Sequence, residues 1–215
     1  MHVETVSAFF DYVNANTASF ALELAGALSG LICVWLLVRE SVWTWPLGLL
    51  YAVISLFIFY GERLYSDWVL HLYYVGMNAY GWYYWTRKGA ERNVEGNLQV
   101  VRMPVQVGVI ATVLTVVGLI AWGRLVVWAL PDADLVYWDS ATTVMSFAAM
   151  WLTARKYLES WAVWLLVDIL LTGIYIYKGI MPYAVLYAIY IGMAVWGWMA
   201  WARTMREVQG APTAA

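Results

Sequence analysis

The chain has 215 residues, of which 64% are hydrophobic, 17% aromatic and 12% charged, and its formal net charge is −2. A composition this apolar excludes an ordinary soluble domain, and the chain lacks the basic patch that nucleic-acid binding needs. The first residues carry Glu4 and Asp11 but no Lys or Arg, so no signal peptide is expected. The single cysteine, Cys33, excludes an intramolecular disulfide.

Seven stretches of the chain are apolar enough to cross the roughly 30 Å hydrocarbon core of a membrane as helices. In chain order they are Ala18–Val38, Trp45–Tyr60, Trp68–Thr86, Pro104–Ala129, Ser140–Thr153, Trp161–Tyr177 and Pro182–Trp201. The connections are too short for a separate soluble domain, so we expect one all-α integral membrane domain over residues 1–215. Asp139 and Ser140 are expected to cap the N-terminus of the fifth stretch.

The sequence contains an internal repeat. When Trp35 is placed on Trp151, the residues through Arg87 fall on those through Arg203 without a gap. The best-matched residues of the first copy are Tyr74, Gly76, Met77, Gly81, Trp82, Trp85 and Arg87, and those of the second are Tyr190, Gly192, Met193, Gly197, Trp198, Trp201 and Arg203. The pattern predicts repeat one at about 18–87, a linking helix at about 104–129 and repeat two at about 139–203.

One linking span between two three-span units gives both units the same direction, a parallel 3+1+3 arrangement as in SWEET sugar transporters. The basic residues fall mostly on one side of this arrangement. That side carries Arg39, Arg87, Lys88, Arg92, Arg102, Arg155, Lys156, Arg203 and Arg206, and the other carries Arg63, Arg124 and Lys178. The positive-inside rule therefore predicts a cytoplasmic C-terminus and an N-terminus outside.

Asp168 is the most informative polar residue, because a carboxyl group within a membrane span is costly. Trp161, Trp164 and Asp168 are spaced by three and four residues and share one helical face. Two indoles beside a carboxylate suit a flat cationic ring through stacking and cation–π attraction. The alternative is an Asp hydrogen-bonded to a neighbouring helix, but no Lys or Arg within the spans is an obvious partner, which favours ligand binding.

The third stretch presents a second face of this kind, formed by His71, Tyr74, Asn78, Trp82 and Trp85. Asn78 can both donate and accept hydrogen bonds, which suits a ligand and an interhelical contact equally well. His71 is expected to contact ligand, to transfer a proton, or to be a structural histidine. The other histidine is His2, so neither a metal site nor any other cofactor is predicted.

The repeat separates framework residues from candidate ligand residues. The polar candidates occur in one copy each, since Asn78 aligns with Ala194, His71 with Tyr187 and Asp168 with Ala52. A nearly symmetric shell around an asymmetric ligand would have this pattern. The glycines Gly76, Gly192, Gly81, Gly197, Gly26 and Gly30 are expected to let helices approach closely.

Other classes of membrane protein fit less well. A retinal protein needs a lysine in its last helix, and Pro182–Trp201 contains none. Neither charge rings nor filter segments typical of a channel are visible. A lone His71 with Asp168 is too little for an intramembrane enzyme. A membrane scaffold without transport activity stays open as an alternative.

Several motifs in combination resemble the PnuC family of vitamin transporters. They are Trp45-Pro46-x-Gly48, Leu64-Tyr65-x-Asp67, Asn78-x-Tyr80-Gly81-Trp82-Tyr83-x-Trp85, Trp138-Asp139-Ser140, Arg155-Lys156-Tyr157-x-Glu159-x-Trp161 and Trp164. The resemblance, over roughly Gly26 to Arg203, implies a homotrimer in the bacterial cytoplasmic membrane. It also implies facilitated diffusion of a vitamin such as nicotinamide riboside, with trapping by phosphorylation in the cytoplasm.

Three positions depart from the pattern of the nicotinamide riboside carriers. Asp168 stands where they have Asn, His71 where Gln is usual, and Met150 where some members have a second Gln. The resemblance assigns these positions to the substrate pocket. Nicotinamide riboside remains the first expectation because most motifs match its carriers, and thiamine is the alternative, since the added carboxylate suits its aminopyrimidine donors.

Overall fold

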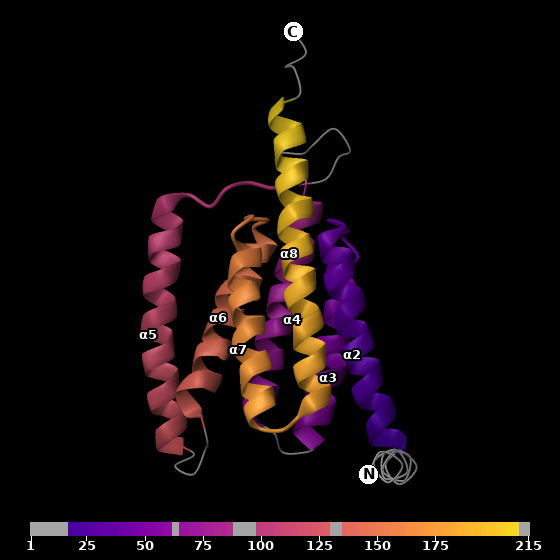
Figure 1. Cartoon of the computed structure of the whole chain (residues 1–215), viewed down its shortest axis with the longest axis vertical. Coiled ribbons are helices and arrows are strands. Elements are labelled where there is room, and N and C mark those ends of the chain that lie inside the picture. Colours follow the sequence, from indigo (N-terminus) through magenta and orange to yellow (C-terminus); the bar gives the residue numbers. More distant parts are fainter. Residues whose placement is uncertain (1–16, 62–64, 88–97, 130–134, 211–215) are drawn as a thin grey trace.

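The computed structural model describes residues 17–61, 65–87, 98–129 and 135–210, and in these ranges it consists of helices joined by short connections (Figure 1). The helices are α2 (Thr17–Val38), α3 (Thr44–Gly61), α4 (Tyr65–Thr86), α5 (Val105–Ala129), α6 (Val136–Ala154), α7 (Ser160–Tyr177) and α8 (Met181–Gly210). An isolated β-bridge joins Val101 and Tyr157. Each predicted apolar stretch coincides with one helix, so the all-α prediction is confirmed.

Two helix ends differ from the prediction. α8 continues to Gly210, well beyond Trp201. α6 begins at Val136 after Leu135, whose φ is 53°, and no side chain caps it, so the predicted cap at Asp139 and Ser140 is wrong. Because the helix starts earlier, Asp139 lies in its first turn, where its carboxylate faces the ammonium group of Lys178 at 3.6 Å.

Three of the described helices meet the length and hydropathy of a membrane span in full: Val105–Ala129, Ser160–Tyr177 and Met181–Val208. Shorter apolar helices occupy Ala25–Val38 and Thr44–Phe57. α4 is less apolar because its interior carries His71 and Asn78. That all seven helices cross the membrane stays a prediction.

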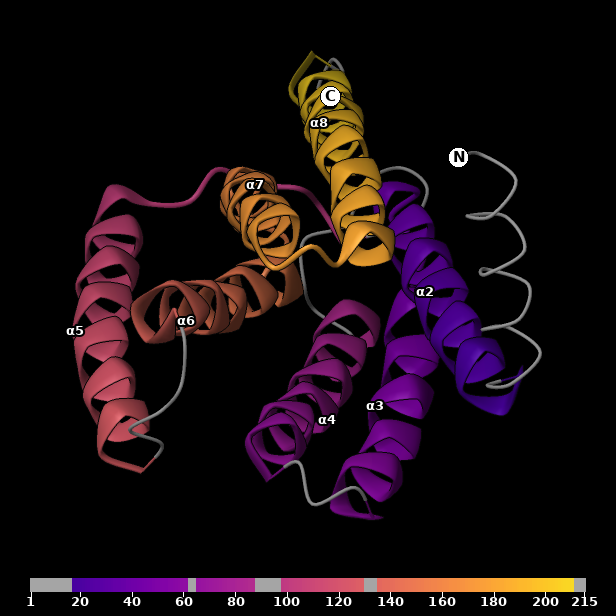
Figure 2. The same cartoon turned by 60° about the horizontal axis from the view of Figure 1, so that its bottom comes forward.

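Six of the described helices form a closed ring, and α5 stands outside it (Figure 2). Going around the ring, α2 contacts α3, α3 contacts α4, α4 contacts α6, α6 contacts α7, α7 contacts α8, and α8 returns to α2. Among the described helices, α5 contacts α6 alone. The ring therefore closes through two contacts, α4 with α6 and α8 with α2.

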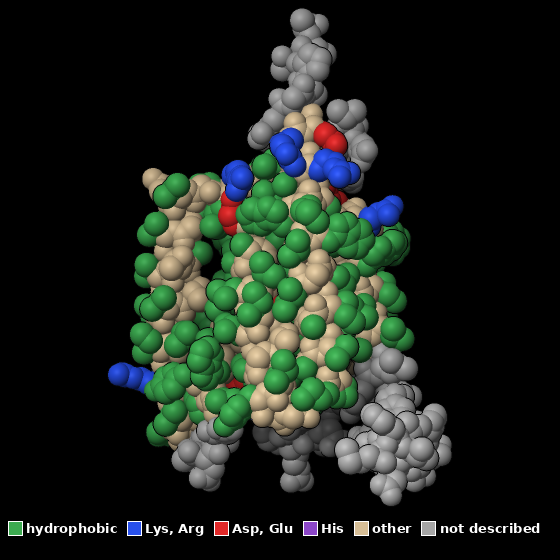
Figure 3. All heavy atoms as spheres, in the orientation of Figure 1, with side chains coloured by type: hydrophobic (Ala, Val, Ile, Leu, Met, Phe, Trp, Pro, Cys, Tyr) green, Lys and Arg blue, Asp and Glu red, His purple; other side chains and the backbone are tan. Residues whose placement is uncertain are grey.

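One end of the bundle is strongly basic. The C-terminal ends of α2, α4, α6 and α8 lie together at this end, and Lys and Arg side chains gather there (Figures 1 and 3). Hydrophobic side chains cover the flank of the bundle below them (Figure 3). We call this end the basic end.

Four tryptophans form the centre of the hydrophobic core, near the basic end. Trp45 meets Trp85 edge to face with ring centroids 5.3 Å apart, and Trp161 meets Trp201 in the same way at 5.3 Å. The two pairs touch each other through Trp85 and Trp201, whose centroids are 6.1 Å apart. All four side chains are at most 2% exposed. The repeated residues thus make the same contact in each half of the ring.

The glycines opposite these rings explain the repeated spacing. The ring of Trp45 lies so close to Gly81, and that of Trp161 so close to Gly197, that neither position has room for a Cβ atom. The predicted close approach is therefore confirmed at these two glycines. It is wrong at Gly76 and Gly192, where a Cβ atom would meet nothing within 4 Å.

Candidate functional site

The candidate site is built around Asp168 of α7, whose side chain is 6% exposed. Its carboxyl group lies close enough to Tyr187 and Tyr190 of α8 to interact with both electrostatically. The Thr172 hydroxyl donates to the backbone carbonyl of Asp168 at 2.7 Å within the same helix. The carboxyl group is thus buried and lies within electrostatic range of two phenols.

α4 contributes a second group of side chains to the interior of the ring. The buried ring of His71 lies 5.6 Å from that of Tyr74 in an edge-to-face contact and 6.0 Å from that of Tyr51 on α3. The Tyr74 hydroxyl lies near the side chain of Ser146 on α6, and the Ser146 hydroxyl donates to the Thr142 carbonyl at 2.7 Å. His71 is therefore enclosed by aromatic rings.

The two groups meet inside the ring. Tyr187 of α8 lies within electrostatic range of Tyr74 of α4, and Tyr190 lies within that of Tyr51 of α3. The Tyr190 hydroxyl also reaches α2, where it lies against Gly30. The resulting set is called the central polar cluster and consists of Tyr51, His71, Tyr74, Asp168, Tyr187 and Tyr190.

Four members of the cluster are related by the repeat. Tyr187 occupies the position of His71 in the second copy, and Tyr190 that of Tyr74. Sequence reasoning singled out His71 and Tyr74 but missed their counterparts and Tyr51. The alignment itself held the signal for Tyr187 and Tyr190, because residues that share a position in two packed repeats face the same interior.

The two tryptophans predicted beside Asp168 have different surroundings. Trp164 is half-buried, and its indole Nε1 donates to Thr153 Oγ1 on α6 at 3.0 Å. Trp161 lies in the tryptophan core, where it packs against Trp201 and Gly197. Trp164 is thus held between α7 and α6, whereas Trp161 serves helix packing in this structure.

The remaining predicted residues lie at different depths. Asn78 is 5% exposed, its Nδ2 donates to the Tyr74 carbonyl at 2.8 Å, and its side-chain oxygen lies against Gly48 of α3. Met150 is half-buried against the hydrophobic core. Trp82 is 43% exposed, so the structure does not bury it with Asn78.

The contact between Asn78 and Gly48 has an unequal counterpart in the second repeat. Gly48 aligns with Trp164, and Asn78 aligns with Ala194. At these positions the first copy thus has a glycine in contact with an amide, whereas the second copy has an indole and a methyl group. This exchange makes the interior of the ring asymmetric although its framework is repeated.

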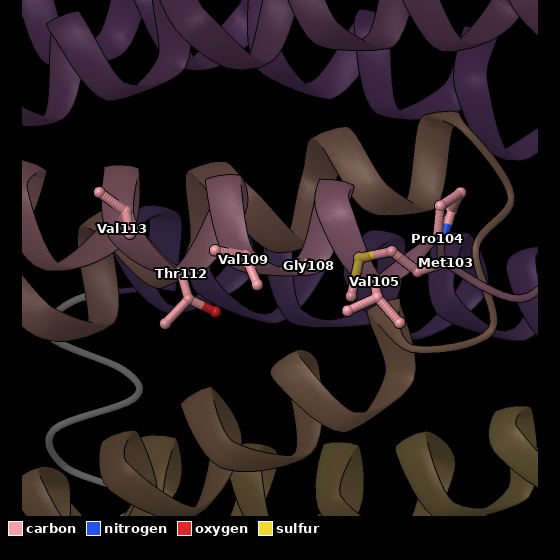
Figure 4. A pocket seen from close by; sticks show the side chains of 7 residues that line it. All are labelled: Met103, Pro104, Val105, Gly108, Val109, Thr112 and Val113. Atoms are coloured by element: carbon pink, nitrogen blue, oxygen red, sulfur yellow. The ribbon is translucent and has the colours of Figure 1, made fainter.

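Two surface grooves lie on α5, away from the central polar cluster. One, of approximately 490 Å³, is lined by Met103, Pro104, Val105, Gly108, Val109, Thr112 and Val113, among which Thr112 supplies the polar side chain (Figure 4). The other, of approximately 750 Å³, runs between α5 and α6 and includes Trp122, Phe147 and Trp151. Neither groove contains a residue predicted to bind substrate.

Comparison with known proteins agrees with this architecture. The family described as "Nicotinamide mononucleotide transporter" matches residues 20–203. The chain is 27% identical over 208 residues to the nicotinamide riboside transporter PnuC of Escherichia coli (strain K12), covering 86% of this chain and 87% of that protein. It is 30% identical over 198 residues to the riboflavin/roseoflavin transporter RibM of Streptomyces davaonensis, covering 88% and 91%.

A solved structure shows the same fold. The crystal structure of the vitamin B3 transporter PnuC superposes with a TM-score of 0.71 over 97% of this chain and 94% of that one, at 22% identity. The family match covers the whole ring and α5. The chain therefore belongs to the nicotinamide mononucleotide transporter family, the PnuC-type vitamin transporters, which are membrane transporters and not enzymes.

Proposed function

We propose that this protein carries nicotinamide riboside across the bacterial cytoplasmic membrane by facilitated diffusion. Uptake is made productive when a cytoplasmic kinase phosphorylates the substrate, which lowers its free concentration inside. The relatives named for nicotinamide riboside support this substrate. The observation that carries the proposal is a buried carboxyl group, Asp168, near Tyr187 and Tyr190 of α8, two tyrosines that in turn approach Tyr74 and Tyr51 of the other half of the ring.

The chemistry of the cluster suits a cationic aromatic vitamin. The pyridinium ring of nicotinamide riboside is flat and positively charged, so it gains from aromatic faces and from a nearby carboxylate. In this proposal Trp164, Tyr74 and Trp82 offer aromatic surface, Asp168 compensates charge, and His71, Asn78 and Met150 shape the polar end. Trp161 supports the site from the tryptophan core. The asymmetric pairs Gly48–Asn78 and Trp164–Ala194 suit a ligand with two unlike ends.

The proposed architecture is two parallel three-helix units, α2–α4 and α6–α8, linked by α5. The order in which the helices contact one another around the ring supports this architecture, and so do the repeated tryptophan–glycine contacts. The excess of Lys and Arg at the basic end supports a cytoplasmic C-terminus and an N-terminus outside. We further propose a homotrimer, with α5 beside the ring available for contacts between subunits.

Thiamine is the second candidate substrate, because it also joins an aromatic ring to a positive charge and offers amino donors to a carboxylate. The relative named for riboflavin shows that substrates differ between similar chains, so riboflavin belongs in the same assay. The alternative of another class, a scaffold without transport activity, predicts that none of the three ligands binds.

Calorimetry of the purified protein, titrated with each ligand in parallel, tests the proposal. We expect nicotinamide riboside to bind and Asp168→Asn, which keeps the shape and removes the charge, to weaken binding at least tenfold. Asp139→Asn is the matched control, because this carboxylate lies outside the cluster. Tighter binding of thiamine would mean that thiamine is the substrate and that the proposed site is correct. Unchanged binding in Asp168→Asn would mean that Asp168 does not belong to the binding site.

Uptake into proteoliposomes tests the transport mode. For facilitated diffusion, the internal substrate concentration rises to the external one and no further, and collapsing a proton gradient leaves the initial rate unchanged. Enclosing a kinase and ATP in the vesicles should raise total accumulation of label without changing that initial rate. Accumulation above equilibrium without a kinase would contradict the mode.

A further inference from the structure

A buried ion pair joins the two repeats at the basic end. The Lys156 ammonium lies 2.7 Å from the Glu40 carboxylate, and the two side chains are 0% and 9% exposed. Glu40 and Lys156 hold the same position in the two copies, directly after α2 and α6. The sequence pattern places Lys156 among the basic residues of one side of the membrane, and the structure buries it against Glu40.

The backbone at the two positions is also the same and is unusual. Glu40 has a φ of 55° and Lys156 a φ of 60°, in the left-handed region where glycine is normally preferred. Each ends its helix with the same pair of hydrogen bonds: Glu40 and Ser41 donate to carbonyls of α2, and Lys156 and Tyr157 donate to those of α6. Strained positions of this kind persist where the side chain has a task.

Tryptophans complete the junction around the ion pair. Lys156 Nζ lies 4.7 Å from the ring centroid of Trp85 and 5.9 Å from that of Trp201, two residues that also share a position in the repeat. Trp85 Nε1 donates to the Ala154 carbonyl of α6 at 3.1 Å, and Trp201 Nε1 donates to the Leu37 carbonyl of α2 at 3.1 Å. Both hydrogen bonds cross from one half of the ring to the other.

The segment before α5 covers the same junction. Lys156 Nζ also donates to the carbonyl of Leu98, and Val101 exchanges backbone hydrogen bonds with Lys156 and Leu158 at 3.2 and 3.0 Å. Leu98 and Val100 are buried in the tryptophan core. One set of contacts around Lys156 therefore joins both halves of the ring and the segment before α5 at the basic end.

From this geometry we infer that the Glu40–Lys156 pair, with Trp85 and Trp201, is the gate of the basic end and is shut in this structure. A ligand that leaves the central polar cluster toward the basic end must pass between the two halves. Separating the halves pulls Glu40 from Lys156 and breaks both indole–carbonyl bonds. Water can solvate these groups once the halves separate. Opening therefore costs less free energy than it would at a purely apolar contact.

The gate rests on the proposed transport function, but its first test needs no ligand. In a Cys33→Ser background, Ala154→Cys places a thiol on a residue that is 0% exposed at the junction. Ala184→Cys is the matched control, since Ala184 is 5% exposed and lies near the start of α8, at the opposite end. The measurement is the rate of labelling by a charged, water-soluble methanethiosulfonate reagent.

Glu40→Gln weakens the pair and should raise the labelling rate of Ala154→Cys about tenfold while leaving that of Ala184→Cys unchanged. The charge exchange Glu40→Lys with Lys156→Glu keeps an ion pair at equivalent backbone positions and should return the rate toward the parent. Equal acceleration at both cysteines would mean that the pair merely stabilises the whole fold, and no acceleration would mean that it does not hold the end shut. Either result overturns the gate.

A second experiment connects the gate to transport. Arg39→Cys with Arg155→Cys places one thiol on each half, next to the ion pair, and bifunctional reagents of graded length then join them. Cross-linking should abolish uptake of nicotinamide riboside, keep its binding, and be reversed by a reductant. The control pair Arg39→Cys with Arg87→Cys lies within one half and should leave uptake intact. Uptake that continues across the first cross-link overturns the gate, whereas a parent protein without uptake contradicts the proposed function alone.

Discussion

The hydroxyl group of Tyr190 on α8 lies directly against the Cα of Gly30 on α2, in a space that a Cβ atom would fill. The same phenol interacts with Asp168. One glycine on the first helix therefore determines where a residue of the central polar cluster sits on the last helix.

We predict that Gly30→Ala moves Tyr190 and weakens substrate binding several-fold with little loss of stability. The added methyl group meets the end of a flexible side chain, which shifts at low cost, so the effect falls on the site more than on the fold. Titration calorimetry with nicotinamide riboside and thermal unfolding report the two effects separately. Gly76→Ala, which meets no atom within 4 Å, is the control and should change neither. An unaltered affinity in Gly30→Ala would mean that the position of Tyr190 does not affect substrate binding.

Gly81→Ala and Gly197→Ala should each destabilise the protein by about 1–3 kcal/mol, the usual cost of overfilling a packed core. Both changes push a methyl group into a buried tryptophan, Trp45 or Trp161, that has little room to move. The unfolding midpoint in detergent, followed by tryptophan fluorescence, measures the loss. Gly192→Ala provides the comparison on the same helix as Gly197, and a midpoint equal to that of Gly197→Ala would refute the packing argument.

Lys156→Met should destabilise the protein by about 3–5 kcal/mol, because it leaves the Glu40 carboxylate buried without its cation. The double variant Lys156→Met with Glu40→Gln removes both charges and should recover a large part of this loss. The same unfolding assay compares the two variants. If the double variant is no more stable than the single one, the ion pair is not what the lysine contributes.

Thr153→Val should weaken substrate binding by about 1–3 kcal/mol, because it removes the acceptor that fixes the indole of Trp164 and leaves a polar group unpaired. Thr142→Val on the same helix is the matched control, since the Thr142 hydroxyl bonds only to backbone carbonyls of its own helix among the contacts described. Affinity from calorimetry distinguishes them. Similar affinities for both variants would show that Trp164 is held by packing without Thr153.

The fold follows closely from the sequence because its signals are local. Runs of apolar residues place the helices, and the repeated spacing of Trp45 and Gly81, or of Trp161 and Gly197, reflects one contact made twice. Part of the site could be predicted from the sequence for the same reason. Asp168 and His71 stand out as polar residues in apolar stretches, and both are buried inside the ring.

The ion pair and the tyrosines of the central polar cluster could not be predicted in this way, because they depend on which helices become neighbours. Glu40 and Lys156 look like ordinary charges at helix ends until the ring closes and brings the two copies together. Tyr51, which is 40% exposed, and the half-buried Tyr187 and Tyr190 are three among 16 tyrosines, and composition does not single out the phenols that lie near Asp168 and His71. The opposite charges at equivalent positions 40 and 156 were a readable signal, because equivalent residues of packed repeats meet near the axis between them.

The length of α8 has a practical consequence. Its 30 residues extend for about 45 Å, whereas a hydrocarbon core is about 30 Å thick, so an α8 that crosses the membrane as predicted would carry its last turns beyond the bilayer as a continuation of one helix. A helical domain fused in frame after Gly210 would be held as a rigid lever. Its angle in single-particle images would report the tilt of α8, and with it the movement of one half of the ring against the other, without a label inside the protein.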